Sequence, residues 1–262
     1  MTGAPPSAPC IAYGDHPDHV ANLHLPAREG GPWPCVVLVH GGFWRTGWDR
    51  TLMTPLARDL AARGIAAWNL EYRRVGQEGG GWPGTLEDVA AALDHLERLD
   101  GVDTERVATV GHSAGGQLAL WLAARHRLPP GSPGGEPGVR PVAAVSQAGV
   151  CDLEQAWRDE LGGGATGALL GSFDEAPERY ALASPASLTP LGVPQLLVHG
   201  SADDIVPPSQ SREHAARDPD ADLAELPGVD HFDVVDPDHV SWRTAADWLA
   251  ERLGREGATR GG

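Results

Sequence analysis

The sequence predicts an α/β fold in which a mostly parallel, doubly wound sheet is flanked by helices. Several short segments are apolar without interruption, which is typical of strands that a parallel sheet buries on both faces. Segments with apolar residues at helical spacing lie between them, and turn signals such as Gly41-Gly42 and Gly64 separate the two kinds. Strands and helices therefore alternate along the chain, and right-handed crossovers are expected between the parallel strands.

The strands are expected in the following order. Residues 20–25 alternate with a period of two, which favours an antiparallel strand at the edge of the sheet. Residues 221–226 are expected to form the last strand along the chain. Between them, five continuous apolar runs are expected to form the buried centre of the sheet: residues 35–40, 65–70, 106–110, 142–146 and 195–199.

Helices are expected where apolar residues recur at helical spacing. Thr85 and Asp88 match the N-cap and N3 positions of a capping box and predict the start of one helix. Another helix is expected directly after Ser113, and a last one is expected around residues 242–249. The first helix is predicted by three leucines that lie four residues apart, at positions 52, 56 and 60.

The remaining stretches predict loops and ends. Glycine and proline mark three loops, at residues 76–84, 129–141 and 162–171, of which the first and third are long enough to border a binding site. We expect one domain over residues 1–262, with an irregular N-terminal segment at 1–18 and a flexible tail at 255–262. No insertion is large enough for a big separate lid domain.

Composition excludes several classes of function. Hydrophobic residues make up 41% of the 262 residues, enough for a sizeable core. The formal net charge of −16 repels phosphates, so neither nucleic acid nor an anionic membrane is expected as a partner. No run approaches the ~20 apolar residues that span a bilayer. The N-terminal residues lack a basic region followed by an apolar run, so a cytoplasmic location is expected.

Cysteine and histidine usage predicts no bound metal. The three cysteines are odd in number and widely spaced, which fits neither a disulfide framework nor a zinc site. Cys35 and Cys151 lie in or beside apolar runs and are expected to be buried as small hydrophobic residues. The segment 15–19 is rich in aspartate and histidine. It is expected to form a solvated turn, because no further ligands at zinc spacing accompany it.

The strongest chemical signal is the segment Gly111-His112-Ser113-Ala114-Gly115. A strand is expected before it and a helix after it, which is the context in which a G-x-S-x-G motif presents a nucleophilic serine. The glycines on either side leave room for the tight turn. The helix that follows places its N-terminal N–H groups near developing negative charge. A glycine-rich turn with an ordinary capping serine is the alternative interpretation.

A second signal, His40-Gly41-Gly42-Phe43-Trp44, directly follows the first buried strand. Glycines at this place let backbone N–H groups approach a ligand, as an oxyanion hole requires. Each such donor contributes about 2.7–4 kcal/mol to catalysis. We assign this role to the N–H groups of Gly42 and Phe43, together with that of Ala114. A simple strand-ending turn is the alternative interpretation.

A serine nucleophile needs a base and an acid that orients it, in the order Ser, acid, His. Asp203 is the preferred acid because it follows a buried strand, and Asp204 is the alternative. His231 is the preferred base, because its competitor His239 lies where the final helix is expected to open. The remaining histidines beside the motifs are interpreted as structural, at positions 40, 112 and 199.

With these motifs in place, the chain resembles the α/β-hydrolases from about Val20 to Leu253. His40 to Trp44 is similar to the HGGxW signature of kynurenine formamidases (arylformamidases) and related esterases. The segment 230–233 is similar to the histidine region of that group. The pattern from His199 to Val206 resembles the acid turn of these hydrolases, and in it the acid aligns with Asp203. Related esterases of the hormone-sensitive-lipase type usually carry a third glycine where Phe43 stands.

The resemblance implies a cofactor-independent serine hydrolase that acts through an acyl-serine intermediate on a small-molecule amide or ester. An N-formylkynurenine-type amide is the preferred substrate, and a broad carboxylesterase is the alternative. A binding protein or an acyltransferase with this fold is a second alternative. The oligomeric state stays open, a homodimer included. Four tryptophans flank the site loops and are candidates for an aromatic substrate surface: Trp44, Trp48, Trp82 and Trp157.

Overall fold

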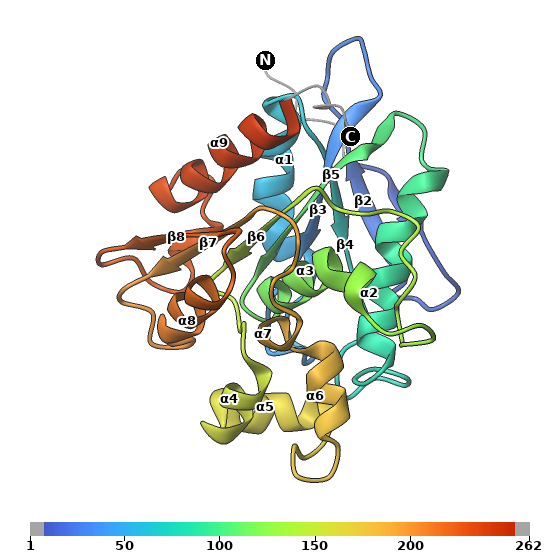
Figure 1. Cartoon of the computed structure of the whole chain (residues 1–262). Helices are drawn as coiled ribbons and strands as arrows, with labels where there is room; N and C mark the ends of the chain where they lie inside the picture. The colour runs from blue at the N-terminus through green and yellow to red at the C-terminus, as the bar shows by residue number, and fades with distance from the viewer. Residues whose placement is uncertain (1–7, 255–262) are drawn as a thin grey trace, which may run out of the picture.

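The computed structural model describes residues 8–254 and has the α/β-hydrolase fold (Figure 1). Its sheet has eight strands in the order β1-β2-β4-β3-β5-β6-β7-β8. The six strands from β3 to β8 run parallel, and β1 and β2 run antiparallel to their neighbours. The strands are β1 Cys10–Ala12, β2 Val20–His24, β3 Trp33–Val39, β4 Ala66–Leu70, β5 Val102–His112, β6 Ala143–Gln147, β7 Gln195–Gly200 and β8 Ala221–Leu226.

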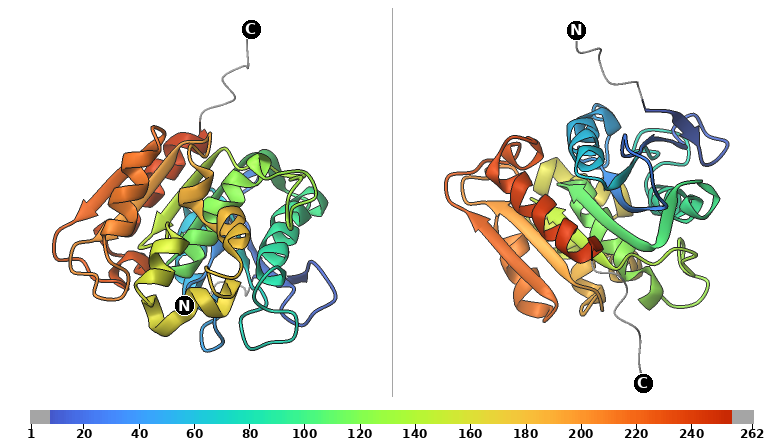
Figure 2. Two further views of the ribbon diagram at one scale, coloured as in Figure 1. Left: turned by 60° about the horizontal axis from the view of Figure 1, so that its bottom comes forward. Right: turned by 90° about the horizontal axis from the view of Figure 1, so that it is seen from above.

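Helices cover both faces of this sheet (Figure 2). Helices α1 and α9 pack on one face, and α2 and α3 pack on the other. Four short helices, α4 to α7, connect β6 to β7 beyond the carboxyl ends of the strands. The helices are α1 Thr54–Ala62, α2 Gly84–Asp94, α3 Ala114–Ala124, α4 Leu153–Arg158, α5 Leu161–Leu170, α6 Pro177–Ala183, α7 Pro185–Leu188, α8 Ser209–Arg217 and α9 Val240–Gly254.

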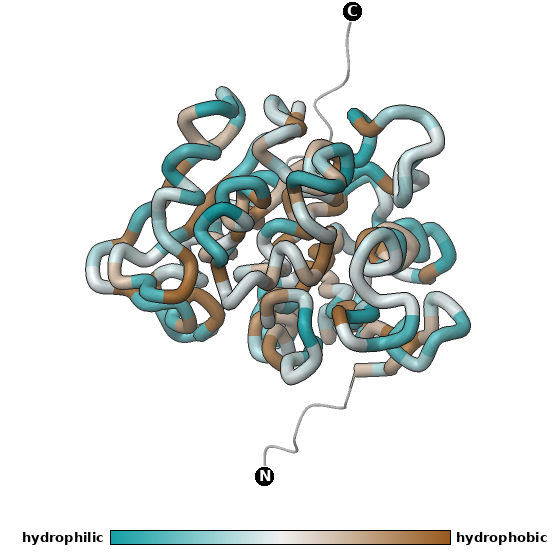
Figure 3. Tube along the Cα trace, turned by 90° about the horizontal axis from the view of Figure 1, so that it is seen from below, coloured by the Kyte–Doolittle hydropathy of each residue, from teal (hydrophilic) through white to brown (hydrophobic). Residues whose placement is uncertain are grey.

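The continuous apolar runs follow from this two-sided cover. Along β3, Val37 and Val39 face the α2 and α3 side, whereas Val36 and Leu38 face the α1 and α9 side. All four side chains are fully buried, and each contributes about 1.5–3 kcal/mol by leaving water. In Figure 3 the hydrophilic segments lie mainly on the outer loops and helix turns. The five predicted central strands are confirmed as β3 to β7.

The N-terminal part of the chain differs from the prediction in two ways. Strand β2 is antiparallel as expected, but it is not at the edge, because β1 pairs with its outer side. The segment 1–18, expected to be irregular, therefore contains a strand, and Tyr13 anchors it through a 2.6 Å hydrogen bond from its hydroxyl to the main-chain oxygen of Glu71. Residues 1–7 of that segment and the predicted tail at 255–262 lie outside the described residues.

The predicted capping box at the start of α2 is wrong. The N-cap residue is Pro83, so Thr85 lies inside the helix. Its hydroxyl accepts a hydrogen bond from the Gly81 N–H and donates one to the main-chain oxygen of Arg73. Asp88 binds the Arg73 guanidinium instead of a helix N–H. Both polar side chains hold the preceding loop, which a local sequence pattern does not reveal.

The predicted loop at 162–171 is also wrong, because α5 occupies most of it. Gly162, Gly163 and Gly164 have left-handed backbones, with φ of 62°, 62° and 71°. Glycine adopts this conformation at no steric cost, so the three residues form a kink that leads into the right-handed turns after them. A glycine run lowers helix propensity, and for that reason it predicted a loop.

The turn at 15–19 is solvated on one side as expected, with Asp15 and Pro17 exposed, and packs against the fold on the other. His19 Nε2 lies 2.9 Å from Asp88 Oδ1, and Asp18 pairs with Arg74 at 3.2 Å. Within residues 8–254, no group of three or more His, Cys, Asp or Glu side chains is placed to hold a metal ion. Nor does any helix in that range combine the length and apolarity needed to cross a bilayer.

Two of the cysteines behave as predicted. Cys35 and Cys151 are fully buried free thiols. Burial raises the pKa of each to about 12, so both stay protonated and pack as small apolar groups.

Candidate active site

The four predicted site segments meet at the carboxyl ends of the parallel strands. The glycine turn follows β3, Ser113 follows β5, Asp203 follows β7 and His231 follows β8. Helices α4 to α7 lie at this same end of the sheet (Figure 1). An open α/β sheet gathers its ligand-facing groups at this edge.

Ser113 occupies a strained turn between β5 and α3. Its φ of 56° and ψ of −120° are rare for a residue with a side chain. A Cβ on Gly111 would lie 1.9 Å from the Gly115 oxygen, and one on Gly115 would lie 2.1 Å from the Val39 oxygen. These positions therefore exclude any other residue. The Ser113 N–H donates to the Gln147 oxygen at 2.8 Å and fixes the turn to β6.

Asp203 binds the His231 ring. The distance from His231 Nδ1 to Asp203 Oδ2 is 2.7 Å, and both residues are buried. The other carboxylate oxygen of Asp203 accepts the N–H groups of Ile205 at 2.9 Å and Val206 at 2.8 Å. The alternative acid, Asp204, is exposed at the surface of the turn. The turn therefore directs only the first of the two aspartates at the imidazole.

The surroundings of Asp203 keep its carboxylate charged. Burial alone would raise the pKa of this group. Hydrogen bonds from His199, His231 and the Val206 N–H outweigh burial and hold its pKa well below the ordinary value. A permanent negative charge at this atom orients the His231 ring and stabilises its protonated form.

His112 connects the serine turn to the histidine loop. Its Nε2–H donates to the main-chain oxygen of His231 at 2.9 Å, and the two rings lie 4.6 Å apart. Burial, together with the nearby His231, lowers the pKa of His112 to about 3, so its ring is neutral. Among residues 8–254, the Ser113 hydroxyl and the His231 ring form no direct hydrogen bond. Such contacts often tighten only when substrate binds.

The other histidines near the site have structural partners. His239 Nδ1 lies 2.7 Å from Ser241 Oγ at the start of α9, where the sequence placed it. His199 Nδ1 lies 2.7 Å from Ser211 Oγ. His40 Nε2 contacts the buried carboxylate of Glu71 at 2.8 Å. Each ring holds a loop or helix in place, in agreement with the structural interpretation.

The glycine turn after β3 presents free N–H groups beside Ser113. A Cβ on Gly41 would lie 2.9 Å from Ser113 Cβ, so the turn passes directly against the serine. Phe43 has a left-handed φ of 52° and Gly42 a φ of 113°. Within the described chain, the N–H groups of Gly42, Phe43 and Ala114 donate to no protein acceptor. Unpaired donors at this place fit the geometry of an oxyanion hole.

One predicted substrate residue is wrong. Trp44 is only 1% exposed, and its indole N–H donates to Gln117 Oε1 at 2.9 Å, so it is part of the core. The left-handed backbone at Phe43 and Trp44 turns this side chain inward. Trp82 and Trp157 are partly buried and pack against the core.

The exposed aromatic surface near the site comes from Trp48, which is one of the four predicted tryptophans, and from Phe232, which was not predicted. Trp48 is 46% exposed and Phe232 is 42% exposed, and their rings stack with centroids 5.5 Å apart. The sequence analysis missed Phe232, although its position directly after His231 was the signal that could have found it.

Two polar residues that the sequence analysis missed hold the glycine turn. Glu71 is buried, and its second oxygen accepts the Arg50 N–H at 3.0 Å while the first contacts His40. Arg45 donates to the main-chain oxygens of Gly162 at 2.9 Å and Gly163 at 3.0 Å. The turn is thus tied to β4 on one side and to α5 on the other.

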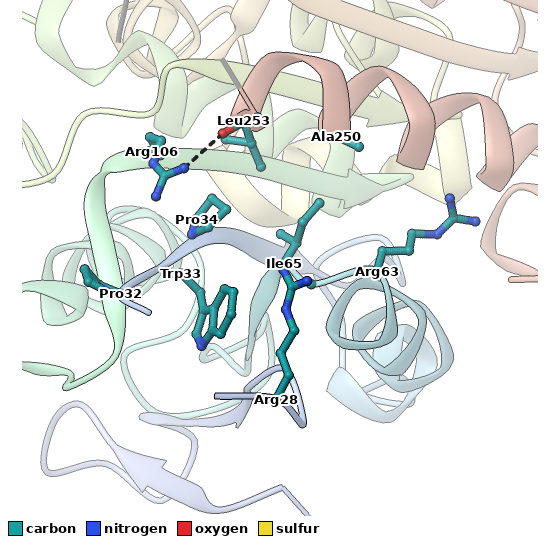
Figure 4. Close-up of a pocket in the computed structure, with 11 residues that line it drawn as sticks. Arg28, Pro32, Trp33, Pro34, Arg63, Ile65, Arg106, Ala250 and Leu253 are labelled. Atoms are coloured by element: carbon teal, nitrogen blue, oxygen red, sulfur yellow. Dashed lines mark hydrogen bonds between the residues drawn. The ribbon is translucent and has the colours of Figure 1, made fainter. Parts of the chain in front are cut away.

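The cavity in Figure 4 is separate from this site. It lies at the amino-terminal ends of the strands, between the start of β3 and the end of α9. Trp33 and Ile65 line it together with Arg28 and Arg106 (Figure 4). Ser113 lies at the opposite, carboxyl ends of the strands, so this cavity has no part in the arrangement described above.

Comparison with known proteins gives one family match. The model of the family described as BD-FAE matches residues 21–217. Among curated proteins, the chain is 30% identical over 250 residues to a probable carboxylic ester hydrolase, LipM, of Mycobacterium tuberculosis, covering 86% of this chain and 56% of that protein. It is 27% identical over 266 residues to the kynurenine formamidase avaC of Aspergillus versicolor, covering 87% of this chain and 90% of that protein.

Solved structures share the fold. A truncated carbohydrate esterase from gut microbiota superposes with a TM-score of 0.79 at 19% identity, over 95% of this chain and 96% of that one. A butyrate-bound thermophilic esterase from Thermogutta terrifontis gives a TM-score of 0.76 at 21% identity, over 98% and 97%. The chain spans 23% to 60% of the length of the first three curated relatives, two of which are an isoprenylcysteine methylesterase and the esterase LipC.

Proposed function

This chain belongs to the BD-FAE family, and on that premise we propose that it is a serine hydrolase that cleaves small carboxylic esters. Ser113 is the nucleophile, His231 the base and Asp203 the residue that orients the base. The N–H groups of Phe43 and Ala114, with that of Gly42, form the oxyanion hole. The esterase names of LipM and LipC support the ester as substrate class.

Acylation begins when the Ser113 oxygen attacks the carbonyl carbon of the ester. The hydroxyl proton passes to His231 Nε2, and the carbonyl oxygen becomes an oxyanion that the free N–H groups stabilise. The bond to the leaving oxygen then breaks, and His231 returns the proton to that oxygen. The alcohol departs and the acyl group stays on Ser113.

Deacylation repeats these steps with water. His231 takes a proton from water as the water oxygen attacks the acyl carbon, and the bond to Ser113 breaks as the serine recovers the proton. The sum is one ester and one water converted into one acid and one alcohol. Asp203 stays charged throughout and stabilises the imidazolium that forms in each half of the cycle.

The contact between Asp203 and His231 carries this proposal. A buried carboxylate 2.7 Å from a ring nitrogen, at the same edge of the sheet as a strained serine turn, is what acyl transfer requires. The donors without protein acceptors beside Ser113 support it independently.

A formamide is the second candidate substrate. The kynurenine formamidase of Aspergillus versicolor matches over most of its own length, and the HGGxW turn resembles that of the group. A formyl group needs little room on the acyl side, and the same Ser113 and His231 steps release an arylamine in place of an alcohol.

A substrate panel tests the proposal. Wild type and Ser113→Ala would be assayed with p-nitrophenyl acetate, p-nitrophenyl butyrate and N-formylkynurenine. We expect ester turnover by the wild type and a loss of several orders of magnitude in the variant. Faster cleavage of the formamide than of the esters would favour the second candidate. Equal turnover by both proteins would remove Ser113 from the mechanism.

Two measurements address the remaining alternatives. A fluorophosphonate is expected to label wild type at Ser113 and to leave the Ser113→Ala variant unlabelled; no adduct on the wild type would favour a binding protein. Product analysis with added alcohols would reveal an acyltransferase, because transfer would then yield a new ester in place of the acid.

A further inference from the structure

The stacked pair Trp48 and Phe232 has no assigned role. Among the described residues, six large apolar side chains are strongly exposed, and these are the two aromatic ones. Their rings lie 5.5 Å apart with 25° between their planes. Exposed aromatic surface is unfavourable in water unless a ligand or partner covers it. The pair lies beyond the carboxyl ends of the parallel strands, where Ser113 also lies.

The backbone on both sides fixes this pair. The main-chain oxygen of Trp48 accepts a hydrogen bond of 2.6 Å from Arg74, and a Cβ on Gly42 would lie 2.8 Å from Trp48 Cβ. Trp48 therefore packs against the oxyanion turn. The Phe232 N–H donates to Asp230 Oδ1 at 2.8 Å, which fixes the base of that side chain.

Phe232 is next to His231 in space as well as in sequence. The two ring centroids lie 5.3 Å apart and the planes are nearly perpendicular. In acyl transfer, the base that takes the serine proton delivers it to the leaving group. The leaving group must therefore lie on the His231 side of the carbonyl carbon, which is where Phe232 projects.

We propose that Trp48 and Phe232 form the subsite for the leaving group and favour esters of arylalkyl alcohols. The inference rests on the proposed function, because it assigns His231 as the proton donor. The flat, exposed rings provide stacking surface for an arene. The pair acts on acylation alone, since the alcohol has left before water attacks.

Two isomeric esters test this assignment. Benzyl acetate carries its ring on the alcohol, and methyl phenylacetate carries it on the acyl group; methyl acetate has no ring. We expect Phe232→Ala and Trp48→Ala each to lower kcat/KM for benzyl acetate about tenfold more than they lower kcat/KM for methyl phenylacetate or methyl acetate. Phe232→Tyr, which keeps the ring, is expected to retain the preference for benzyl acetate.

A matched control uses another exposed apolar residue. Leu223 is 38% exposed on β8, and Leu223→Ala is expected to leave all three esters unchanged. An equal loss for both isomers in Phe232→Ala, or no loss for benzyl acetate, would overturn the subsite. The subsite would also be overturned if Phe232→Tyr, which keeps the ring, lost the preference for benzyl acetate.

A binding measurement separates this inference from the proposed function. Benzyl alcohol binding to Ser113→Ala would be followed by ligand-observed NMR, with and without Phe232→Ala. We expect binding that weakens when the ring is removed, whether or not the wild type turns over esters. Binding that is the same with and without the Phe232 ring would reject the subsite. Absent ester turnover would reject the proposed function alone.

Discussion

The Nε2–H of His112 donates a 2.9 Å hydrogen bond to the main-chain oxygen of His231. A carbonyl can only accept, so this contact fixes the neutral tautomer of the ring with its proton on Nε2. The other ring nitrogen is buried and has no partner among the described residues. His112 thus ties the loop of the proposed base to the turn that presents Ser113.

Replacing His112 should disturb His231 without touching substrate. We expect His112→Ala to lower kcat by up to about 100-fold, because a small displacement of a catalytic group can reduce rate that strongly. KM should change little. His112→Gln, which keeps an N–H donor, is expected to recover part of the rate. Steady-state kinetics and the rate of fluorophosphonate labelling check this.

The control is His126→Ala, an exposed histidine whose ring contacts the main-chain oxygen of Ala123. It should behave as wild type. If His112→Ala changed only the free energy of unfolding and left both kcat and the labelling rate intact, the connection between the two loops would have no catalytic consequence.

Neighbouring aspartates give a second prediction. Asp203→Asn should lower kcat by roughly 10⁴-fold, because the imidazole loses the charge that orients it and stabilises its protonated form. Asp204→Asn should stay within twofold of wild type, since that side chain is exposed and Asp203 alone binds His231. Similar losses in both variants would contradict the assignment of Asp203. The assay is turnover of p-nitrophenyl acetate.

Stability should fall in acid because two buried histidines are neutral. Burial, with the nearby His231, lowers the pKa of His112 to about 3, and burial lowers that of His214 to about 4. The unfolded chain binds these protons near the ordinary value of 6.5, so between pH 6.5 and 4 it holds more protons than the folded chain. The free energy of unfolding therefore decreases as pH falls, by up to about 1.4 kcal/mol per pH unit for each histidine.

Asp203 adds to this loss only at lower pH. Its pKa is lower in the folded state than in the unfolded chain. Its contribution to the free energy of unfolding is therefore present above pH 3.8, the ordinary pKa of aspartate, and is lost as pH falls further. Urea unfolding at pH 7, 5.5 and 4.5 measures the dependence. His214→Gln should give a shallower decline than wild type, and a decline of equal slope would exclude His214 as a source.

Local patterns predicted the parts of this site whose requirements are local. Gly111 and Gly115 lie so close to neighbouring main-chain atoms that a Cβ would clash there. The turn therefore requires glycine at both positions, and their spacing is visible in the sequence. The buried strands were predictable for a similar reason, since cover on both faces demands a continuous apolar run. The sequence already favoured Asp203 over Asp204, and the structure adds the physical reason, which is that the turn directs Asp203 inward and leaves Asp204 exposed.

Features that depend on distant contacts were not predictable. Strand β2 was placed at the edge because the three-residue partner β1 has no recognisable pattern. Trp44 was assigned to the substrate surface, but its backbone turns it towards Gln117, seventy-three residues later. The position of Phe232 beside His231 was visible in the sequence, but its stacking with Trp48, which lies 184 residues earlier in the chain, was not.

The kink at the start of α5 gives a matched pair of substitutions. Gly162 and Gly163 both have a φ of 62°, so an alanine at either position costs about 1–2 kcal/mol of left-handed strain. Their surroundings differ. A Cβ on Gly162 would lie 2.4 Å from the Phe43 ring, whereas one on Gly163 would meet nothing within 4 Å.

Gly162→Ala should therefore reduce activity as well as stability. The new methyl group displaces the Phe43 ring, and with it the N–H that we assign to the oxyanion hole. A donor that loses alignment lowers kcat, here by about tenfold, less than the loss of a whole donor. Gly163→Ala adds the left-handed strain without the clash, so it should lower the melting temperature less and keep kcat near wild type. Thermal unfolding and ester kinetics on both variants distinguish the two effects, and equal kcat values would show that α5 does not position Phe43 for catalysis.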